Sequence, residues 1–392
     1  MATQNNPRAA PGRAEAAFAR APYLMTALAV AALTLGCWGQ QTAAAAAAAA
    51  PPAHRTVVLI VTDGLRWQEV FRGAAPELLN RKYGGLEDVQ AIRKQFGGAT
   101  DKARRRELLP FFWRVVARRG EVFGDRDRGA VARVTNRYWF SYPGYNEMLT
   151  GHADPRINSN SYGPNPNQTV FGWLNREPGL RGRVAVFATW DAFTDIFNEP
   201  RSHLFLRTGW QPPDLGLSPA ERQLNWLYAH TTRLWRGLAY DSFMQAEVLD
   251  YLRHHHPRVL FVGYGETDEW AHAGRYGQVL LSAHRFDYFV SQLWRTMQAN
   301  PFYRGRTDFV LTTDHGRGGG LGDWKNHGAS HPGSGNIWIG LLGPGIPAAG
   351  VLGHSSRATQ SQIAATIAAL LGRDWRRSAP QAAPPLPLSE TK

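Results

Sequence analysis

Cysteine is nearly absent from this sequence, because its 392 residues contain only Cys37. A framework of structural disulfides is therefore excluded. An uninterrupted apolar run long enough to cross a bilayer, about 20 residues, is also missing from the leading segment. The apolar run from Tyr23 to Leu35 is shorter than that, and we expect no transmembrane helix.

The first 50 residues have the composition of an export leader. Three arginines between residues 8 and 20 precede the apolar run, and an alanine tract follows it. We interpret residues 1–50 as a signal peptide with an Ala-rich spacer, and we predict an exported protein, periplasmic or attached to the envelope of a bacterium. Cys37 ends a Leu-Thr-Leu-Gly-Cys stretch that resembles a lipoprotein cleavage box, so a lipid anchor at Cys37 is the alternative to a cleaved signal. The sequence does not indicate an oligomeric state.

A dense basic block with interleaved aromatic residues is absent, although the formal net charge is +13. Grooves that bind nucleic acids gather basic and aromatic side chains, so we expect no nucleic-acid-specific binding. The positive charge is spread along the chain, which favours a solvated basic surface that can attract a small anionic substrate.

Strand and helix patterns alternate through the rest of the chain. Five apolar runs without polar alternation predict strands that are covered on both faces: 57–62, 184–188, 259–264, 309–312 and 337–342. Helices are expected at 107–118, 222–253, 278–298 and 359–371. This pattern predicts an α/β fold with a mostly parallel central sheet and helices on both faces.

The segments between these elements define the expected domain. Residues 71–106 and 191–219 are rich in Gly, Pro, Trp and charge, and we interpret them as loops or cap elements over a site. Residues 54–376 form one expected domain, and the Pro-rich residues 377–392 are expected to be a disordered tail.

Residues able to bind a metal follow three of the predicted strands and recur in one later loop. In open α/β sheets ligands bind beyond the carboxyl ends of the strands, so these side chains should converge on one crevice. A single strand-end aspartate is often only a helix N-cap, and the prediction therefore depends on the combination. The six side chains are Asp63, Asp268, His272, Asp314, His315 and His327.

A mixed set of imidazole and carboxylate ligands is typical of zinc, with manganese or iron as alternatives. Two ions roughly 4 Å apart hold the attacking and leaving oxygens of a displacement at phosphorus. We therefore predict two divalent metal ions, Zn²⁺ first and Mn²⁺ as the alternative.

Ser141 lies between an aromatic run and Pro143, where a strand-like stretch turns into a helix. A serine hydroxyl is a poor nucleophile at neutral pH, but a bound metal ion lowers its pKa. A helix N-terminus also presents backbone N–H groups to an anion. Ser141 is thus a candidate nucleophile, with a simple helix cap as the alternative.

Together these motifs resemble the alkaline phosphatase superfamily of metal-dependent hydrolases. The stretches that carry the resemblance are VVLIVTDGLR, FSYPGYNEMLTG, GETDEWAH, TTDHGRG and WKNHG. The closest branch is the nucleotide pyrophosphatase and phosphodiesterase group, where a Thr or Ser precedes an aromatic-Pro step and a Leu-x-Thr-Gly ending follows.

The resemblance implies a division of the ligands between two ions. One ion would be held by Asp268, His272 and His327, and the other by Asp63, Asp314, His315 and Ser141. It also implies that Ser141 attacks phosphorus and forms a phosphoserine, which is then hydrolysed.

Substrate contacts are less well defined by the resemblance. The branch has an asparagine directly after the proline, whereas this sequence has Gly144. We consider Asn146 as a substitute, and Arg317 and Lys325, which flank the metal motifs, as phosphate-binding candidates.

The expected function is hydrolysis of phosphate monoesters or diesters, with a small anionic phosphoester as the partner. A sulfatase is one alternative, but the sulfatase motif has an arginine where this chain has Tyr145. A relative of phosphoglycerate mutase would need a large inserted domain for which the chain is short. Outside the superfamily, a non-catalytic anion-binding envelope protein is the further alternative.

Overall fold

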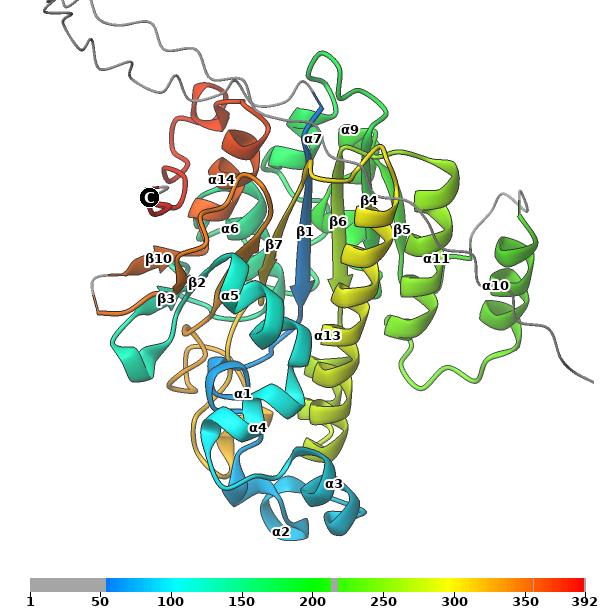
Figure 1. Cartoon of the computed structure of the whole chain (residues 1–392). Helices are drawn as coiled ribbons and strands as arrows, with labels where there is room; N and C mark the ends of the chain where they lie inside the picture. The colour runs from blue at the N-terminus through cyan, green and yellow to red at the C-terminus, as the bar shows by residue number, and fades with distance from the viewer. Residues whose placement is uncertain (1–53, 213–217, 355, 391–392) are drawn as a thin grey trace, which may run out of the picture. The chain divides into compact units, whose positions relative to one another are not determined.

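A mostly parallel sheet of eight strands forms the centre of the structure, a computed structural model that describes residues 54–212, 218–354 and 356–390 (Figure 1). The strand order is β5-β4-β6-β1-β7-β8-β2-β9. β8 runs antiparallel to both of its neighbours, whereas the other pairs run parallel. In chain order these strands are β1 (Thr56–Thr62), β2 (Glu121–Phe123), β4 (Val184–Ala188), β5 (Phe205–Thr208), β6 (Val259–Tyr264), β7 (Thr307–Thr312), β8 (Ile339–Leu342) and β9 (Gly350–Val351). A separate parallel pair joins β3 (Val131–Arg133) to β10 (Arg357–Thr359).

Helices pack on both faces of this sheet. The α-helices are α1 (Trp67–Arg72), α2 (Arg81–Gly84), α3 (Val89–Phe96), α4 (Asp101–Leu108), α5 (Ala117–Arg119), α6 (Ser141–Thr150), α7 (Val170–Leu174), α8 (Phe193–Ile196), α9 (Glu199–Ser202), α10 (Pro219–His230), α11 (Asp241–His254), α12 (Glu266–His272), α13 (Tyr276–Ala299) and α14 (Gln362–Leu370). Short 3-10 turns are η1 (Pro76–Leu78), η3 (Arg126–Arg128), η4 (Asp323–Lys325) and η5 (Trp375–Arg377), and η2 (Phe112–Val116) is a π-helical turn.

The central strand β1 shows why the sheet is covered on both faces. Alternate side chains of a strand point to opposite faces, and those of β1 enter two different cores. Val58 and Ile60 pack in the core that includes α11 and α13, whereas Val57, Leu59 and Val61 pack in the core that includes α6, α7 and α14. Complete burial of such a side chain contributes about 1.5–3 kcal/mol, so both faces stabilise the strand.

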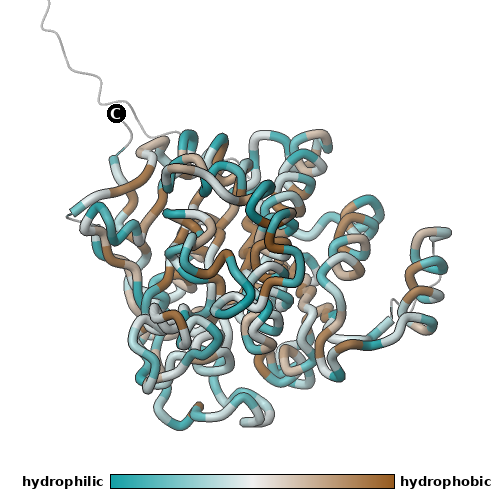
Figure 2. The backbone as a smooth tube through the Cα atoms, turned by 90° about the horizontal axis from the view of Figure 1, so that it is seen from below, coloured by the Kyte–Doolittle hydropathy of each residue, from teal (hydrophilic) through white to brown (hydrophobic). Residues whose placement is uncertain are grey.

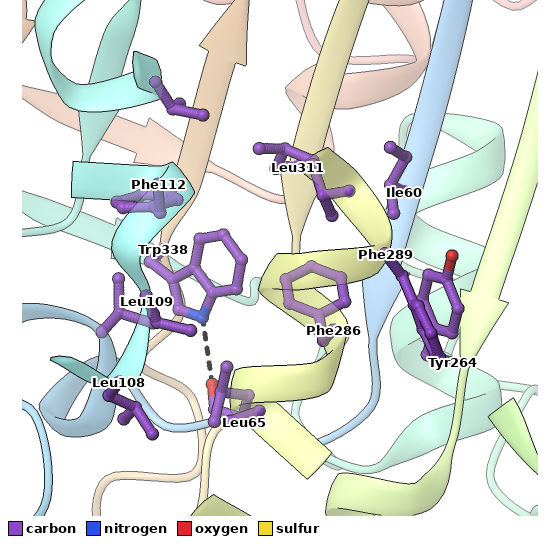
Figure 3. Packing of buried hydrophobic residues seen from close by; sticks show 14 of the residues in the cluster. Ile60, Leu65, Leu108, Leu109, Phe112, Tyr264, Phe286, Phe289, Leu311 and Trp338 are labelled. Carbon is purple, nitrogen blue, oxygen red and sulfur yellow. Dashed lines mark hydrogen bonds between the residues drawn. The ribbon is translucent and has the colours of Figure 1, made fainter. Parts of the chain in front are cut away.

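The first of these cores is rich in aromatic residues. Figure 3 shows Phe286 and Phe289 of α13 packed near Ile60 and Leu311 of the sheet. The Trp338 indole also lies in this core, and its Nε1 donates to the Leu65 carbonyl at 3.0 Å. Figure 2 shows the apolar segments concentrated in the middle of the molecule, with hydrophilic segments around them.

The predicted fold class and the five predicted strands are confirmed. They correspond to β1, β4, β6, β7 and β8, and the sheet carries helices on both faces. The additional strands β2, β5 and β9 are two to four residues long, too short to leave an apolar run in the sequence. Among the described residues, no helix combines the length and the apolarity needed to cross a membrane.

The helix predicted at 107–118 is wrong only as one continuous α-helix, because Leu109 interrupts it and helical structure resumes at Pro110. α4 ends at Leu108, and the backbone of Leu109 leaves the helical region with φ −126° and ψ 67°. The next residue is Pro110, and a proline disfavours the helical conformation of the residue before it. The chain then continues through η2 and α5.

The single helix predicted at 222–253 is also wrong, because two helices occupy this region. α10 starts at a capping box formed by Ser218 and Glu221 and ends at Thr231, which is extended. Residues 231–240 connect it to α11 and include two threonines and Gly237, residue types with low helix propensity.

Residues 71–106 and 191–219 contain more regular structure than the expected loops. The first segment forms α1 to α4, and the second contains α8, α9 and β5. Asn80, Asp88 and Thr100 each accept a backbone N–H at the start of a short helix in the first segment. These caps stabilise the short helices together with buried apolar side chains such as Ile92 and Phe96 of α3.

The chain end is packed and not disordered as far as the structure describes it. Ala379, Ala382 and Leu386 are buried beside α14. The Leu386 N–H donates to Thr366 Oγ1 at 2.8 Å, and Ser389 donates to Glu121. The predicted leader, with Cys37, lies outside the described residues.

Replacing Leu386 with alanine should lower the free energy of unfolding by about 2–5 kcal/mol, because the variant loses a buried side chain and leaves a cavity. Urea unfolding followed by circular dichroism measures this change. The exposed Gln381 provides the control, since Gln381→Ala should leave the urea midpoint unchanged. Equal midpoints for both variants would mean that the tail does not pack.

Candidate active site

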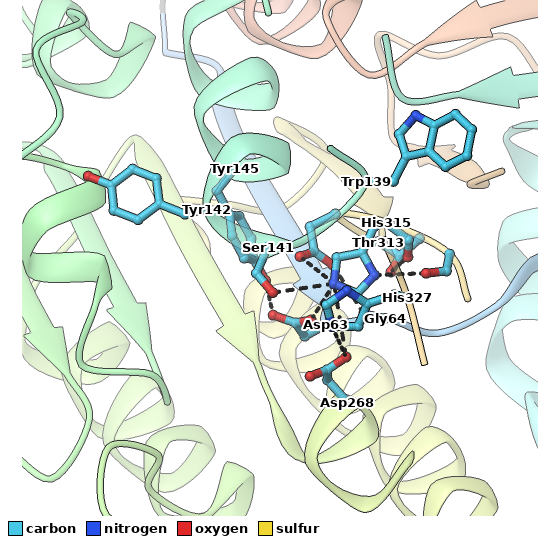
Figure 4. Close-up of polar contacts among 12 residues, drawn as sticks. Asp63, Gly64, Trp139, Ser141, Tyr142, Tyr145, Asp268, Thr313, His315 and His327 are labelled. Carbon is cyan, nitrogen blue, oxygen red and sulfur yellow. Dashed lines mark hydrogen bonds and ion pairs between the residues drawn. The ribbon is translucent and has the colours of Figure 1, made fainter. Parts of the chain in front are cut away.

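Five of the six predicted ligand side chains follow the carboxyl ends of three adjacent strands, in the order β6, β1, β7, and the sixth, His327, joins them from the loop after η4. Asp63 follows β1, Asp268 and His272 lie on α12 directly after β6, and Asp314 and His315 follow β7. Figure 4 shows Asp63, Ser141, Asp268 and His327 gathered around His315.

One group of possible ligands surrounds His315. Its Nε2 atom lies 3.4 Å from Asp63 Oδ1, 3.4 Å from Asp314 Oδ2 and 3.3 Å from Ser141 Oγ. Asp63, Asp314 and His315 are all buried and their ligand atoms are close enough to hold one ion. Asp63 Oδ1 and Asp314 Oδ2 have no hydrogen-bond partner among the described residues. Buried carboxylate oxygens without a partner are costly, so this donor set fits a divalent cation.

A second group lies next to it. His272 Nε2 is 3.1 Å from Asp268 Oδ2 and 2.9 Å from His327 Nε2, and His327 Nε2 is 3.8 Å from Asp268 Oδ1. Asp268, His315 and His327 form the second arrangement that can hold an ion. His315 therefore borders both groups, and the set of seven donors, with Ser141, is contiguous.

Burial and mutual repulsion dominate the electrostatics of the carboxylates. Burial raises the pKa of Asp63 well above its usual value, and the charges of Asp314 and Asp268 raise it further. Burial likewise raises the pKa of Asp314 to about 7. A cation between these carboxylates would relieve both effects.

Asp268 behaves in the opposite way. Burial raises its pKa, but the Arg317 guanidinium, a hydrogen bond from His272 and the nearby His327 together lower that pKa well below its usual value. Burial, followed by the charge of His315, lowers the pKa of His327 to about 2. His327 is thus a neutral imidazole, which is the form that binds metals.

Two glycines allow the close approach of these elements. Gly64 has φ +62°, and an added Cβ would lie 2.6 Å from Asp268 Oδ1. Its N–H donates to Asp314 Oδ1 at 3.1 Å. An added Cβ on Gly144 would lie 2.6 Å from the Asp314 carbonyl oxygen. Gly144 therefore lets α6 pack against the turn after β7, which accounts for a glycine at this position.

Ser141 is the first residue of α6, directly after a strained turn. Trp139 has φ 55°, a conformation that costs a residue of this type about 1–3 kcal/mol. Asn136 stabilises the turn, since its Oδ1 accepts the N–H groups of Tyr138 and Trp139 at 3.0 and 3.1 Å. The turn directs Ser141 toward His315, whereas the Tyr142 ring points away from the ligands (Figure 4).

Glu147, on the same helix, anchors this turn from behind. Its fully buried carboxylate accepts the N–H groups of Thr135 and Asn136 at 2.9 and 2.7 Å. It also accepts the hydroxyl protons of Thr135 and Ser361, each at 2.8 Å. The nucleophile candidate is therefore held between its own helix and a buried carboxylate.

The first turn of α6 offers fewer free N–H groups than the sequence indicated. The Tyr142 N–H donates to Asn160 Oδ1 at 3.0 Å, and the Gly144 N–H donates to the Phe140 carbonyl. Pro143 has no N–H. Asn160 itself borders the cavity beside Ser141, and because its Oδ1 is occupied, its amide group is the one left to bind an anion. No spacing or motif in the sequence distinguished Asn160 from its neighbours.

The three predicted substrate contacts lie elsewhere. Asn146 is completely buried, and its Oδ1 accepts the amide groups of Asn165 and Asn167. Arg317 is 2% exposed, and its NH1 atom contacts Asp268 Oδ1 at 2.8 Å. Lys325 lies in η4, with its side chain beside Gly274. None of the three is among the described residues that line the cavity.

A cavity of about 230 Å³ opens onto both ligand groups. Pockets for drug-sized ligands span about 300–1,000 Å³, so this one suits a small substrate. The side chains that line it from the predicted set are Asp63, Ser141, Asp268, His272 and His327.

Comparison with solved structures identifies the fold. No family model and no curated protein matches the sequence. The alkaline phosphatase PafA is 11% identical with a TM-score of 0.55, over 83% of this chain and 97% of PafA. The phosphonate monoester hydrolase SpPMH from Silicibacter pomeroyi is 13% identical with a TM-score of 0.50, over 84% of this chain and 77% of SpPMH. A putative sulfatase from Bacteroides thetaiotaomicron is 13% identical with a TM-score of 0.51, over 82% of this chain and 71% of that protein.

The fold is alkaline phosphatase-like. Identities of 11–13% establish the fold and not a branch, so kinship with the nucleotide pyrophosphatase and phosphodiesterase group stays a prediction. The solved structures with this fold include both phosphatases and a putative sulfatase.

Adding Zn²⁺ should raise the melting temperature of the protein, and Asp314→Asn should abolish most of that shift. An ion bound only by the folded state stabilises it by mass action. In chelator the variant should be at least as stable as the wild type, because burial disfavours the charged form of Asp314. Thermal unfolding with and without chelator, together with metal analysis, tests this.

The exposed Asp323 offers a matched control, and Asp323→Asn should keep the full zinc shift. If the wild type binds no divalent ion, or if Asp314→Asn retains the shift, the assignment of these ligands is refuted.

Replacing Glu147 with glutamine should lower the free energy of unfolding by about 1–3 kcal/mol, because an amide NH₂ group would face buried N–H donors. Urea unfolding measures the loss. Glu107→Gln, at an exposed position on α4, should leave stability unchanged. A Glu147→Gln variant as stable as the wild type would show that the carboxylate does not hold the turn.

Proposed function

We propose that this protein is an exported, metal-dependent hydrolase of phosphate monoesters or diesters that uses Ser141 as its nucleophile. The observation that supports it is the placement of Ser141 Oγ, 3.3 Å from His315 Nε2, at the border of the two ligand groups and facing the cavity. A hydroxyl that served only as a helix cap would not need to face six metal-type side chains.

Two divalent ions would be held by the groups described above, one by Asp63, Asp314, His315 and Ser141 and the other by Asp268, His272 and His327. When bound, they would lower the pKa of the Ser141 hydroxyl and of a water molecule and neutralise charge on the leaving oxygen. Zn²⁺ fits the mixed nitrogen and oxygen donors, with Mn²⁺ as the alternative.

The reaction proceeds in two displacements at phosphorus. Ser141 Oγ loses its proton to solvent and attacks phosphorus, so that a new O–P bond forms as the bond to the leaving alkoxide breaks. The alkoxide takes a proton from water and departs as an alcohol. Water then attacks the phosphoserine, which releases phosphate, or a phosphate monoester from a diester, and restores the hydroxyl.

The protein side chains supply positioning. The turn held by Asn136 and Glu147 fixes the direction of the Ser141 hydroxyl, and the Asn160 amide is placed to donate to a phosphoryl oxygen. Arg317 fixes Asp268 through two contacts, from NH1 to Oδ1 and from NH2 to the carbonyl oxygen. Arg317 is a positioning residue for a metal ligand, not a substrate contact.

The residue at position 145 argues against sulfatase activity. The sulfatase motif has an arginine at this position, whereas Tyr145 is buried and donates to Asp63 Oδ2 at 3.1 Å. A sulfatase is the competing function, so sulfate esters should be tested as substrates beside the phosphate esters.

Ser141→Ala should reduce hydrolysis of p-nitrophenyl phosphate and bis-p-nitrophenyl phosphate by about 10³-fold or more, because the nucleophile is lost. Metal analysis should show that the variant still binds divalent ions, since the histidine and aspartate donors remain. The exposed Ser242 on α11 is the control, and Ser242→Ala should retain wild-type rates.

The same assay should lose its signal when a chelator is added. Wild-type turnover by Ser141→Ala would remove the serine from the nucleophile role. Faster release from p-nitrophenyl sulfate than from both phosphate esters would make the protein a sulfatase. No chelator-sensitive release from any ester would leave the non-catalytic binding protein.

A further inference from the structure

The cavity wall outside the predicted ligand set has an unusual composition for a site that binds an anion. Four side chains contribute to it: Asn160, Trp190, Leu238 and Glu269. No lysine or arginine lines the cavity within the described parts of the chain. The substrate must therefore tolerate a carboxylate as its neighbour.

Glu269 is not engaged by the protein. It lies on α12, one residue after Asp268, and is partly exposed to the cavity. In the described ranges its carboxylate has no hydrogen bond and no ion pair, and the nearby Arg317 guanidinium is bound to Asp268 instead. A carboxylate that faces a substrate cavity without a hydrogen-bond or ion-pair partner is available to bind a positive group on the substrate.

Trp190 contributes an aromatic side chain to the same cavity wall. It follows β4 and pairs with Leu238 through an isolated bridge, and its ring meets Phe193 edge-on at 6.1 Å. The indole rings of Trp67, Trp113 and Trp210 are each covered by an arginine, at 4.6, 3.7 and 5.0 Å. Within the described residues no cationic side chain covers Trp190.

The segment that carries Leu238 extends this aromatic wall. Trp235 lies in the same connection between α10 and α11, and its ring contacts Trp270 of α12 at 4.9 Å. Trp270 follows Glu269 in sequence. The connection between the two helices thus approaches α12 at the residue next to the carboxylate.

We propose that Trp190, Leu238 and Glu269 form a cation subsite that binds a positively charged leaving group. The preferred substrates are then phosphate esters of amino alcohols, such as those of a quaternary ammonium alcohol like choline. An indole face attracts an ammonium ion, the carboxylate neutralises its charge, and Leu238 contacts its methyl groups. This subsite rests on the proposed function, because the phosphorus atom must lie at Ser141.

Two substrates of similar shape distinguish the effect of the leaving group's charge from the effect of its size. Phosphocholine carries a quaternary ammonium group, and 3,3-dimethylbutyl phosphate is its neutral carbon counterpart. With the metal-loaded full chain, phosphate release should give a kcat/KM about 10-fold higher for phosphocholine. Glu269→Gln and Trp190→Leu should each bring this ratio toward one, whereas Glu107→Gln, the exposed control of equal charge change, should preserve it.

Binding of the alcohol alone tests the subsite without turnover. Calorimetric titration should show that choline binds the wild type more tightly than 3,3-dimethylbutanol, and that Glu269→Gln removes the difference. Equal affinity for the two alcohols and equal kcat/KM for the two esters would overturn the subsite.

Two further outcomes separate this inference from the proposed function. If Glu269→Gln loses metal and slows both esters equally, Glu269 belongs to the metal centre and the subsite is refuted. If p-nitrophenyl phosphate is hydrolysed but phosphocholine is not preferred, the proposed function stands and the subsite fails. Preferential choline binding without hydrolysis of any ester would refute the proposed function and, with it, the role of this wall as a leaving-group subsite.

Discussion

The convergence of three carboxylates, two buried and one partly buried, is the constraint on which the rest of this structure depends. Asp268, Asp63 and Asp314 follow the neighbouring strands β6, β1 and β7, so the parallel order of the sheet itself brings like charges together. Two of them have raised pKa values because burial and their neighbours oppose ionisation. Such repulsion is tolerated where a cation compensates it, and the surrounding imidazoles are the partners a cation would share.

The same convergence explains the geometry around Ser141, the proposed nucleophile. α6 must approach the turn after β7 closely enough to place Ser141 beside His315, and Gly144 provides the necessary space. The approach also requires the strained backbone of Trp139. Strain of this kind persists only when the surroundings fix it, and the buried hydrogen bonds of Glu147 and Asn136 do so. Stability elsewhere in the fold thus maintains a conformation that serves the site.

The features that could be predicted from the sequence are those that follow from hydrophobic periodicity and from the position of residues at strand ends. The buried strands left apolar runs, and Asp63, Asp268 and Asp314 could be placed together because parallel strands end at one edge. The direction in which each side chain points could not be predicted from the sequence. Arg317 reaches Asp268 and not the cavity, Asn146 points into a buried amide network, and Asn160 faces the cavity from an irregular loop. The packed chain end was missed because a Pro-rich composition conceals a few well-spaced apolar residues such as Leu386.

Charge acts at two ranges in this molecule. The formal net charge of +13 attracts anions toward the surface from a distance, but salt screens such fields within about 8 Å under physiological conditions. Inside the cavity the balance is reversed, because the described side chains that line it include acids and histidines and no lysine or arginine. Under the proposed function, bound cations would attract the phosphoryl group to the site, since the side chains alone would repel it. In the proposed subsite, Glu269 and Trp190 then discriminate among substrates by the alcohol that is esterified to the phosphate.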